Sequence, residues 1–176
     1  METKRLVFLD ESGMRLDEIP RYGWGARGKK VFDKAKHMGW THVTMLGAIA
    51  ADGVRAVVNI ETSTTSEVFR AFVIQQLVPT LKKGDCVVMD NLSYHKDKLA
   101  VEAITRAEAT ILYLPPYSPD RNPIEKFWAK LKEFVRRQIT CTRDMFNEAV
   151  ASAIAHTRTT DIVGWIGHCG YPITSN

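Results

Sequence analysis

Two short apolar runs, each ending in an aspartate, most strongly constrain the fold of this chain. Residues 6–10 read LVFLD and residues 86–90 read CVVMD. Continuous apolar runs of this length are typical of strands buried on both faces of a sheet, and an acid at the carboxyl end of such a strand lies at the rim where sites form. A single strand-ending Asp is often only a turn former. Two such strands favour a buried sheet with a site at the edge where the strands end.

A third acid stands at a predicted helix start. In the segment Tyr113–Arg137, Asn122 and Pro123 suit the N-cap and first helical positions, which places Glu125 third. Apolar residues then recur at helical spacing and form one face, which Glu125 borders. A Glu at this position often completes a capping box, which would be a purely structural role for Glu125. The functional alternative is that Glu125 and the two strand-end aspartates together supply three carboxylates to a metal.

A hairpin is predicted after the first strand. Val43–Ala50 and Val54–Ile60 are rich in β-formers and flank the turn signal Asp52-Gly53. We expect this hairpin to pair antiparallel with the strand that ends at Asp10.

Helices are predicted between and after the strands. Thr64 and Glu67 suit a capping box at the start of the first one, and Pro79 kinks or stops it ahead of Gly84. The remaining expected elements are a helix over Lys96–Ala107, a strand over Thr110–Leu114 and a helix capped by Thr142.

The sequence motifs around the three acids resemble those of a known family. They are LDES at Asp10, MDNLSYH at Asp90 and LPPYSPDRNPIEKFWAKLK at Glu125, and positions 91–124 separate the last two acids. These motifs are similar to those of the DDE transposases in the bacterial insertion-sequence branch of the mariner-like superfamily. The resemblance extends from Leu6 to Tyr171. It implies an α/β, RNase H-like fold, with a mixed five-stranded sheet flanked by helices.

The resemblance also implies the domain organisation. We expect residues 1–176 to form a single DDE catalytic domain, in which residues 11–41, approximately, are an insertion between the first and second strands. Such transposases carry a helix-turn-helix region ahead of this core. The nine residues before Asp10 are too few for one, so we expect that region to be absent.

The implied catalytic residues are Asp10, Asp90 and Glu125, which would bind two Mg²⁺ ions per active site, with Mn²⁺ as a substitute. In this assignment Asp10 bridges the two ions and the other acids complete one site each. Three further polar residues are expected to orient the acids or to contact a phosphate near the site: Asn91, His95 and Asn122. The structural alternatives are a turn or cap for Asn91 and a helix-entry group for His95.

Several cations suggest contact with DNA. The chain has 24 Lys and Arg against 20 Asp and Glu, and this net charge of +4 is too mild to assign a nucleic-acid partner alone. The expected DNA-contacting residues are Arg21, Trp24, Arg27, Lys29 and Lys30 in the insertion, and Lys132 and Arg136 in the helical row of Glu125. The alternative for the insertion is a solvated loop whose aromatic residues fix it to the core.

Other classes of protein are disfavoured. Cys86, Cys141 and Cys169 form no C-x-x-C pair, and the five His have no zinc spacing, so reduced thiols and no zinc are expected. No apolar run approaches the roughly 18 residues of a membrane span, and no signal peptide is evident. We expect a cytoplasmic bacterial protein that is nucleoid-associated when bound to DNA.

The resemblance implies metal-dependent cleavage of double-stranded DNA at element ends and strand transfer into target DNA. The implied assembly is a homodimer on DNA, with ends read by an upstream helix-turn-helix module or by a separate partner. Two alternatives remain open. One is an RNase H-like nuclease without joining activity, and the other is a non-catalytic DNA-binding remnant, against which the intact acids weigh.

Overall fold

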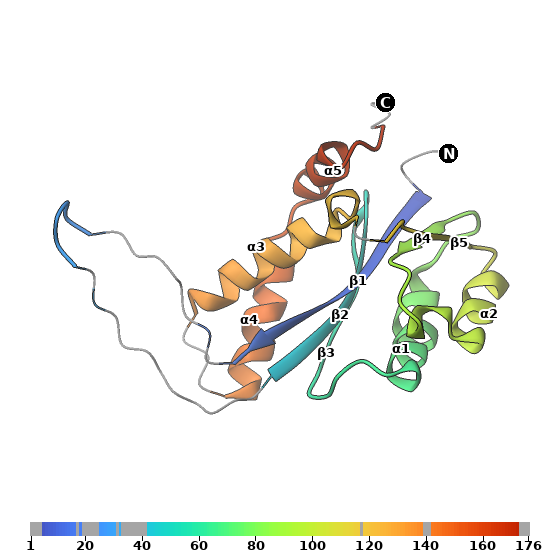
Figure 1. Cartoon of the computed structure of the whole chain (residues 1–176), viewed down its shortest axis with the longest axis horizontal. Helices are drawn as coiled ribbons and strands as arrows, with labels where there is room; N and C mark the ends of the chain where they lie inside the picture. Colours follow the sequence, from blue (N-terminus) through green and yellow to red (C-terminus); the bar gives the residue numbers. More distant parts are fainter. Residues whose placement is uncertain are drawn as a thin grey trace.

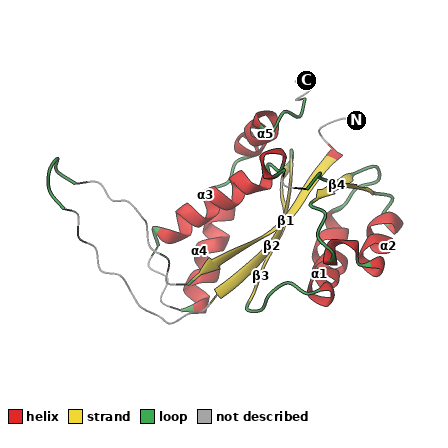
Figure 2. Ribbon diagram, in the orientation of Figure 1, coloured by secondary structure: helices red, strands yellow, loops and turns green. Residues whose placement is uncertain are grey.

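The computed structural model describes residues 5–16, 18, 25–30, 32, 42–116, 118–138 and 142–172. Five strands form one sheet in the order β3-β2-β1-β4-β5, with β1 antiparallel to β2 and parallel to β4 (Figure 2). Their bounds are β1 Leu6–Arg15, β2 His42–Ala50, β3 Gly53–Ile60, β4 Cys86–Met89 and β5 Thr110–Tyr113. The predicted mixed five-stranded sheet is therefore confirmed.

Helices cover both faces of the sheet. Figure 1 shows α1 and α2 on one side and α3, α4 and α5 on the other. Their bounds are α1 Ser66–Phe72, α2 Lys98–Arg106, α3 Ile124–Arg136, α4 Arg143–Ala155 and α5 Thr159–His168. Short 3₁₀ turns, Tyr94–Lys96 and Pro119–Arg121, precede α2 and α3. Two apolar cores result, one on each face of the sheet.

The alternation of β1 decides which core receives each of its side chains. Leu6 and Phe8 belong to the core under α3, and Val7 and Leu9 belong to the core under α1 and α2. Because successive side chains of a strand point to opposite faces, Asp10 continues the row of Leu6 and Phe8. Its carboxylate therefore lies on the face that α3 covers.

The first strand is longer than predicted. Residues Glu11 to Arg15 continue to pair with β2, from Glu11 opposite Leu46 to Arg15 opposite His42. Only Met14 among them is buried and apolar, so the apolar-run criterion ended the strand at Asp10. Backbone pairing with the long β2 carries it further and shortens the expected insertion at its start.

The predicted helix starts were partly wrong. The N-cap of α1 is Thr65, whose hydroxyl accepts from the Val68 amide, and not Thr64. The helix continues as a π turn, Val73–Leu77, and a 3₁₀ turn, Val78–Thr80, so it stops early, directly after Pro79. The predicted cap at Thr142 is confirmed, because its hydroxyl accepts from the Met145 amide at 3.2 Å.

The start of α3 also differs from the prediction. The helix begins at Ile124 with no side-chain cap, which makes Glu125 its second residue and not its third. Asn122 does not cap the helix, because its side-chain amide instead donates to Asp10. The backbone carbonyl oxygen of Asn122 accepts a hydrogen bond from the backbone amide of Glu125 at 3.1 Å, and this bond joins the two residues at the helix start.

Candidate active site

Asp10 is the buried member of the predicted site. Only 8% of the residue is exposed. One carboxylate oxygen accepts from the Glu11 amide at 2.8 Å, and the other from the Asn122 side chain at 3.4 Å. Burial raises the pKa of Asp10 and the Glu11 hydrogen bond lowers it; with the smaller effect of the negative charges of Glu125 and Asp90, which raise it, the pKa is about 8. Asp10 thus lies within electrostatic range of both other predicted acids.

Asp90 follows the last residue of β4. The parallel register pairs Leu6 with Cys86 and Phe8 with Val88, so continuing it by two residues puts Asp90 level with Asp10. Its carboxylate contacts His95 Nδ1 at 2.5 Å and accepts from the Leu92 amide at 3.2 Å. Partial burial acts to raise the pKa of Asp90, but these contacts outweigh it and hold the pKa below its usual range.

Glu125 is exposed and reaches the site because α3 packs closely on the sheet. One helical turn after it, Trp128 is 1% exposed and lies over Gly47 of β2. A Cβ atom added at Gly47 would lie 2.6 Å from the indole, so only glycine permits this approach. Gly47 pairs across the sheet with Asp10. The packing of α3 therefore sets the position of Glu125 relative to Asp10.

The donor chemistry of this cluster fits a hard divalent cation. Asp10 is buried within electrostatic range of Asp90 and Glu125, and the side-chain oxygen of Asn122 is buried without a hydrogen-bond partner. A bound cation would offset both the burial of the Asp10 carboxylate and its repulsion by the other two acids. As the side chains stand, no three His, Cys, Asp or Glu residues of the described chain are arranged to hold a metal ion.

The three residues predicted to support the acids occupy different environments. His95 is completely buried, its Nδ1 also lies 3.2 Å from the Asp90 carbonyl oxygen, and its Nε2 has no hydrogen-bond partner. Asn122 is buried and donates to Asp10. Asn91 is exposed. The structure thus brings two of the three directly onto the acids.

The residues predicted to contact DNA also differ in their environments. Arg27, Lys29 and Lys30 are exposed, whereas Arg21 and Trp24 lie outside the described residues. Arg136 is held in an ion pair with Glu18 at 2.8 Å.

Lys132 is half-buried, which lowers its pKa, while the charges of Glu18, Glu125 and Asp10 act to raise it. Its ammonium group is thus within electrostatic range of Asp10 and Glu125.

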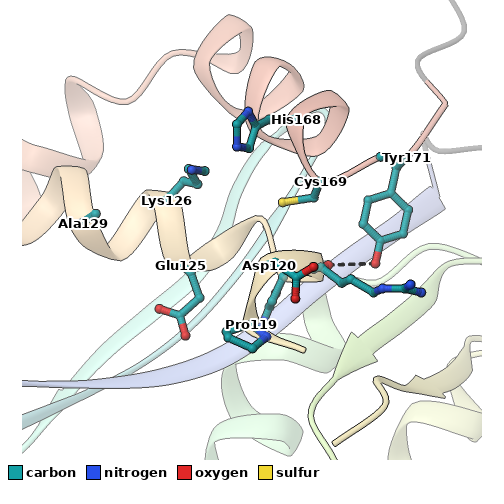
Figure 3. A pocket seen from close by; sticks show the side chains of 11 residues that line it. Pro119, Asp120, Glu125, Lys126, Ala129, His168, Cys169 and Tyr171 are labelled. Atoms are coloured by element: carbon teal, nitrogen blue, oxygen red, sulfur yellow. Dashed lines mark hydrogen bonds between the residues drawn. The ribbon is translucent and has the colours of Figure 1, made fainter. Parts of the chain in front are cut away.

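A pocket of about 960 Å³ opens beside Glu125 (Figure 3). It lies between the start of α3 and the end of α5, and its lining includes Lys126, His168 and Cys169. The sequence predicts no functional role for these residues. No local pattern links α5 to Glu125, because only the tertiary packing of α5 on α3 brings them together.

None of the helices within the described residues has both the length and the apolar character of a membrane span.

No curated protein matches the chain. Among solved structures, the chain is similar to a Mos1 transposase paired-end complex with the left transposon end, at 14% identity and a TM-score of 0.78, over 95% of this chain and 52% of that one.

Two further structures are similar. One is the Mos1 strand transfer complex, at 14% identity and a TM-score of 0.76, over 95% of this chain and 52% of that chain. The other is the mariner Mos1 paired end complex with Mg, at 13% identity and a TM-score of 0.74, over 94% and 53%. The chain spans about half the length of these proteins, and the similarity establishes an RNase H-like fold.

The family comparison covers most of the chain. The model of the DDE superfamily endonuclease family matches residues 5–146, which include all three acids and the elements that carry them. The chain therefore belongs to the DDE superfamily endonucleases.

Proposed function

We propose that this chain is the catalytic domain of a transposase from the bacterial insertion-sequence branch of the mariner-like superfamily. It would cleave DNA at element ends and join the freed 3′-hydroxyl to target DNA. The observation that carries the proposal is the electrostatic coupling of Asp10 to Asp90 and to Glu125, which come from separate elements of an RNase H-like fold. The Mos1 complexes with transposon ends and in strand transfer support it by analogy of fold.

Asp10, Asp90 and Glu125 would hold two Mg²⁺ ions, or Mn²⁺ in their place. Bound divalent cations would supply Lewis acidity to the attacking and leaving oxygens of the phosphodiester. A similar structure contains Mg. The carboxylate donors of this site are those that hard cations prefer.

The chain's own residues would prepare the acids for this task. Asn122 donates to Asp10 and fixes one of its oxygens. His95 contacts Asp90 and holds that carboxylate at the end of β4. Glu125 is placed by the packing of Trp128 one turn further along α3. Each acid thus has its own positional support, which limits the reorganisation needed when substrate binds.

The proposed partner is double-stranded DNA, both element ends and target, bound by a homodimer. Base-edge reading in the major groove would come from a helix-turn-helix module, in the same protein or in a separate one. The similar transposase chains are about twice as long as this one. The corresponding site of action is the bacterial nucleoid.

A two-stage assay tests this proposal. Supercoiled plasmid carrying a candidate element end is incubated with the protein and Mg²⁺, and nicking is followed with and without a chelator. A pre-cleaved end with a free 3′-hydroxyl is then offered with target plasmid. Metal-dependent nicking together with joined product supports a transposase. Nicking without joining would indicate an RNase H-like nuclease, and neither reaction would indicate a DNA-binding remnant.

A further inference from the structure

The pocket beside Glu125 is a built feature of the fold. Its floor and walls come from the 3₁₀ turn before α3, the first turns of α3 and the end of α5 (Figure 3). The Tyr171 hydroxyl donates to the Arg121 carbonyl oxygen at 2.9 Å, and the Tyr171 ring packs edge-on against Phe8. These contacts tie the end of α5 to the segment that carries Asn122.

The pocket is continuous with the candidate active site. Asn122 and Glu125 line it, and Asn122 also donates to Asp10. A strand of DNA whose scissile phosphate lies at the acids would therefore have this pocket as an adjoining surface. A volume of about 960 Å³ exceeds what a single ion needs and suits a nucleotide-sized group.

The cations of this pocket are available for binding, in contrast to others on α3. Lys130 is bound to Asp161 at 2.6 Å, and Arg136 is bound to Glu18. Within the described residues, the Lys126 side chain has neither a hydrogen bond nor an ion pair. Burial raises the pKa of the Cys169 thiol, and the nearby Lys126 ammonium group partly offsets this rise.

Arg121 contributes only its backbone carbonyl to the Tyr171 contact, which leaves its guanidinium exposed. Exposed His168 adds a third polar donor from α5.

We propose that this pocket binds backbone phosphates of the DNA strand that continues from the scissile phosphate. Lys126 and Arg121 are the phosphate ligands, and His168 contacts the strand from the α5 side. The inference rests on the proposed function, because it takes the acids as the place of cleavage. Contacts of this kind position the strand and carry no sequence information.

Salt dependence of DNA binding provides the test. Binding of a fluorescein-labelled random-sequence duplex is measured by anisotropy over a series of potassium chloride concentrations, in chelator so that no cleavage occurs. Each lost phosphate contact should lower the slope of log K against log [salt] by about 0.9. We expect that reduction for Lys126→Gln and for Arg121→Gln, and a larger one for the double variant.

Lys98→Gln is the matched control. Lys98 is an exposed lysine in the first turn of α2, on the opposite side of the sheet. Its removal changes the net charge equally and should leave the slope unchanged. Lys126→Arg should restore the wild-type slope. If Lys126→Gln and Arg121→Gln keep the wild-type slope, or if Lys98→Gln lowers it as much, the pocket is not the phosphate site.

The plasmid assay separates this inference from the proposed function. A wild-type protein that cleaves with Mg²⁺, while the pocket variants bind and cleave as Lys98→Gln does, overturns the pocket alone. A wild-type protein that never cleaves, while the pocket variants lower the salt slope, overturns the catalytic proposal and leaves a phosphate-binding pocket. Thermal melting of all variants checks that each is folded.

Discussion

Trp128 lies so close over Gly47 that a Cβ atom on residue 47 would be 2.6 Å from Cη2 of the indole ring and 3.0 Å from its Cζ2. Gly47 is the β2 partner of Asp10, and Trp128 follows Glu125 by one helical turn. One contact between α3 and the sheet thus fixes the distance between two of the three acids. The absence of a side chain at residue 47 is a condition for the site.

Gly47→Ala should therefore damage both stability and activity. The added methyl group must displace the fully buried Trp128 ring, and overpacking of this kind costs about 1–3 kcal/mol, or a fall in Tm of roughly 2–4 °C per kcal/mol. Cleavage should fall further than the loss of folded protein explains, because Glu125 moves with α3. Gly13→Ala is the control, since a Cβ atom there meets nothing within 4 Å. Equal melting of the two variants would show that the sheet and helix yield easily.

The start of α1 offers a direct comparison of two adjacent threonines. Thr65 caps the helix through the Val68 amide, whereas the Thr64 hydroxyl is buried without a partner. Thr65→Ala should cost about 1 kcal/mol, as the loss of an N-cap does. Thr64→Ala should be close to neutral, because it removes a buried hydroxyl that makes no hydrogen bond. Chemical denaturation of both variants measures this difference, and the reverse order would restore the capping box predicted from the sequence.

The frame of the fold could be predicted from the sequence because its signals are local. The apolar runs before Asp10 and Asp90, the Asp52-Gly53 turn and the apolar face after Glu125 each specify an element within a few residues. The extension of β1 to Arg15 could not be predicted in this way, since it depends on hydrogen bonds to β2.

In the candidate active site, too, the features with a local sequence signal could be predicted, whereas those that depend on tertiary packing could not. The resemblance around Asp10, Asp90 and Glu125 identified them, and in the structure Asp10 lies within electrostatic range of the other two. The side chain of Asn122 was predicted as a helix cap, but the nearby Asp10 carboxylate competes for it. The pocket between α5 and Glu125 forms only when segments distant in the sequence pack together, so no local sequence pattern predicts it.

The ion pair between Asp97 and Arg70 predicts a specific response to acid. The Arg70 guanidinium, at 2.5 Å, and the Ala100 amide lower the pKa of Asp97 from 3.8 to about 2. A depressed folded-state pKa contributes stability that is fully present above the unfolded pKa of 3.8 and is lost as pH falls through 2.

Asp97→Asn keeps a residue able to cap α2 and removes the charge. It should therefore melt below wild type at neutral pH, with the difference closing as pH approaches 2. A difference in melting temperature that does not change with pH would contradict this account. Glu102→Gln, which removes an exposed carboxylate paired with Arg106 on the same helix, is the control.

The metal-free site should be a source of instability. Asp10 is buried beside two other acids, and burial and repulsion both disfavour its ionised form. Asp10→Asn should therefore raise the stability of the metal-free protein, on the order of 1 kcal/mol. Mg²⁺ should stabilise the wild type more than the variant, because the variant lacks one carboxylate ligand. Melting of both proteins with and without Mg²⁺ measures this, and a metal-free variant that melts clearly below wild type would show that Asp10 is structurally required.

The most direct test of the catalytic claim compares single neutral substitutions at the three acids. Asp10→Asn, Asp90→Asn and Glu125→Gln are purified as folded proteins and assayed for Mg²⁺-dependent nicking of supercoiled plasmid. Glu133→Gln is assayed beside them, because this exposed acid lies two turns after Glu125 on the same helix and outside both the acid cluster and the adjoining pocket. The account predicts that each of the first three abolishes nicking while Glu133→Gln retains it. Near-wild-type nicking by any one of the three would contradict the assignment of that residue to the catalytic set.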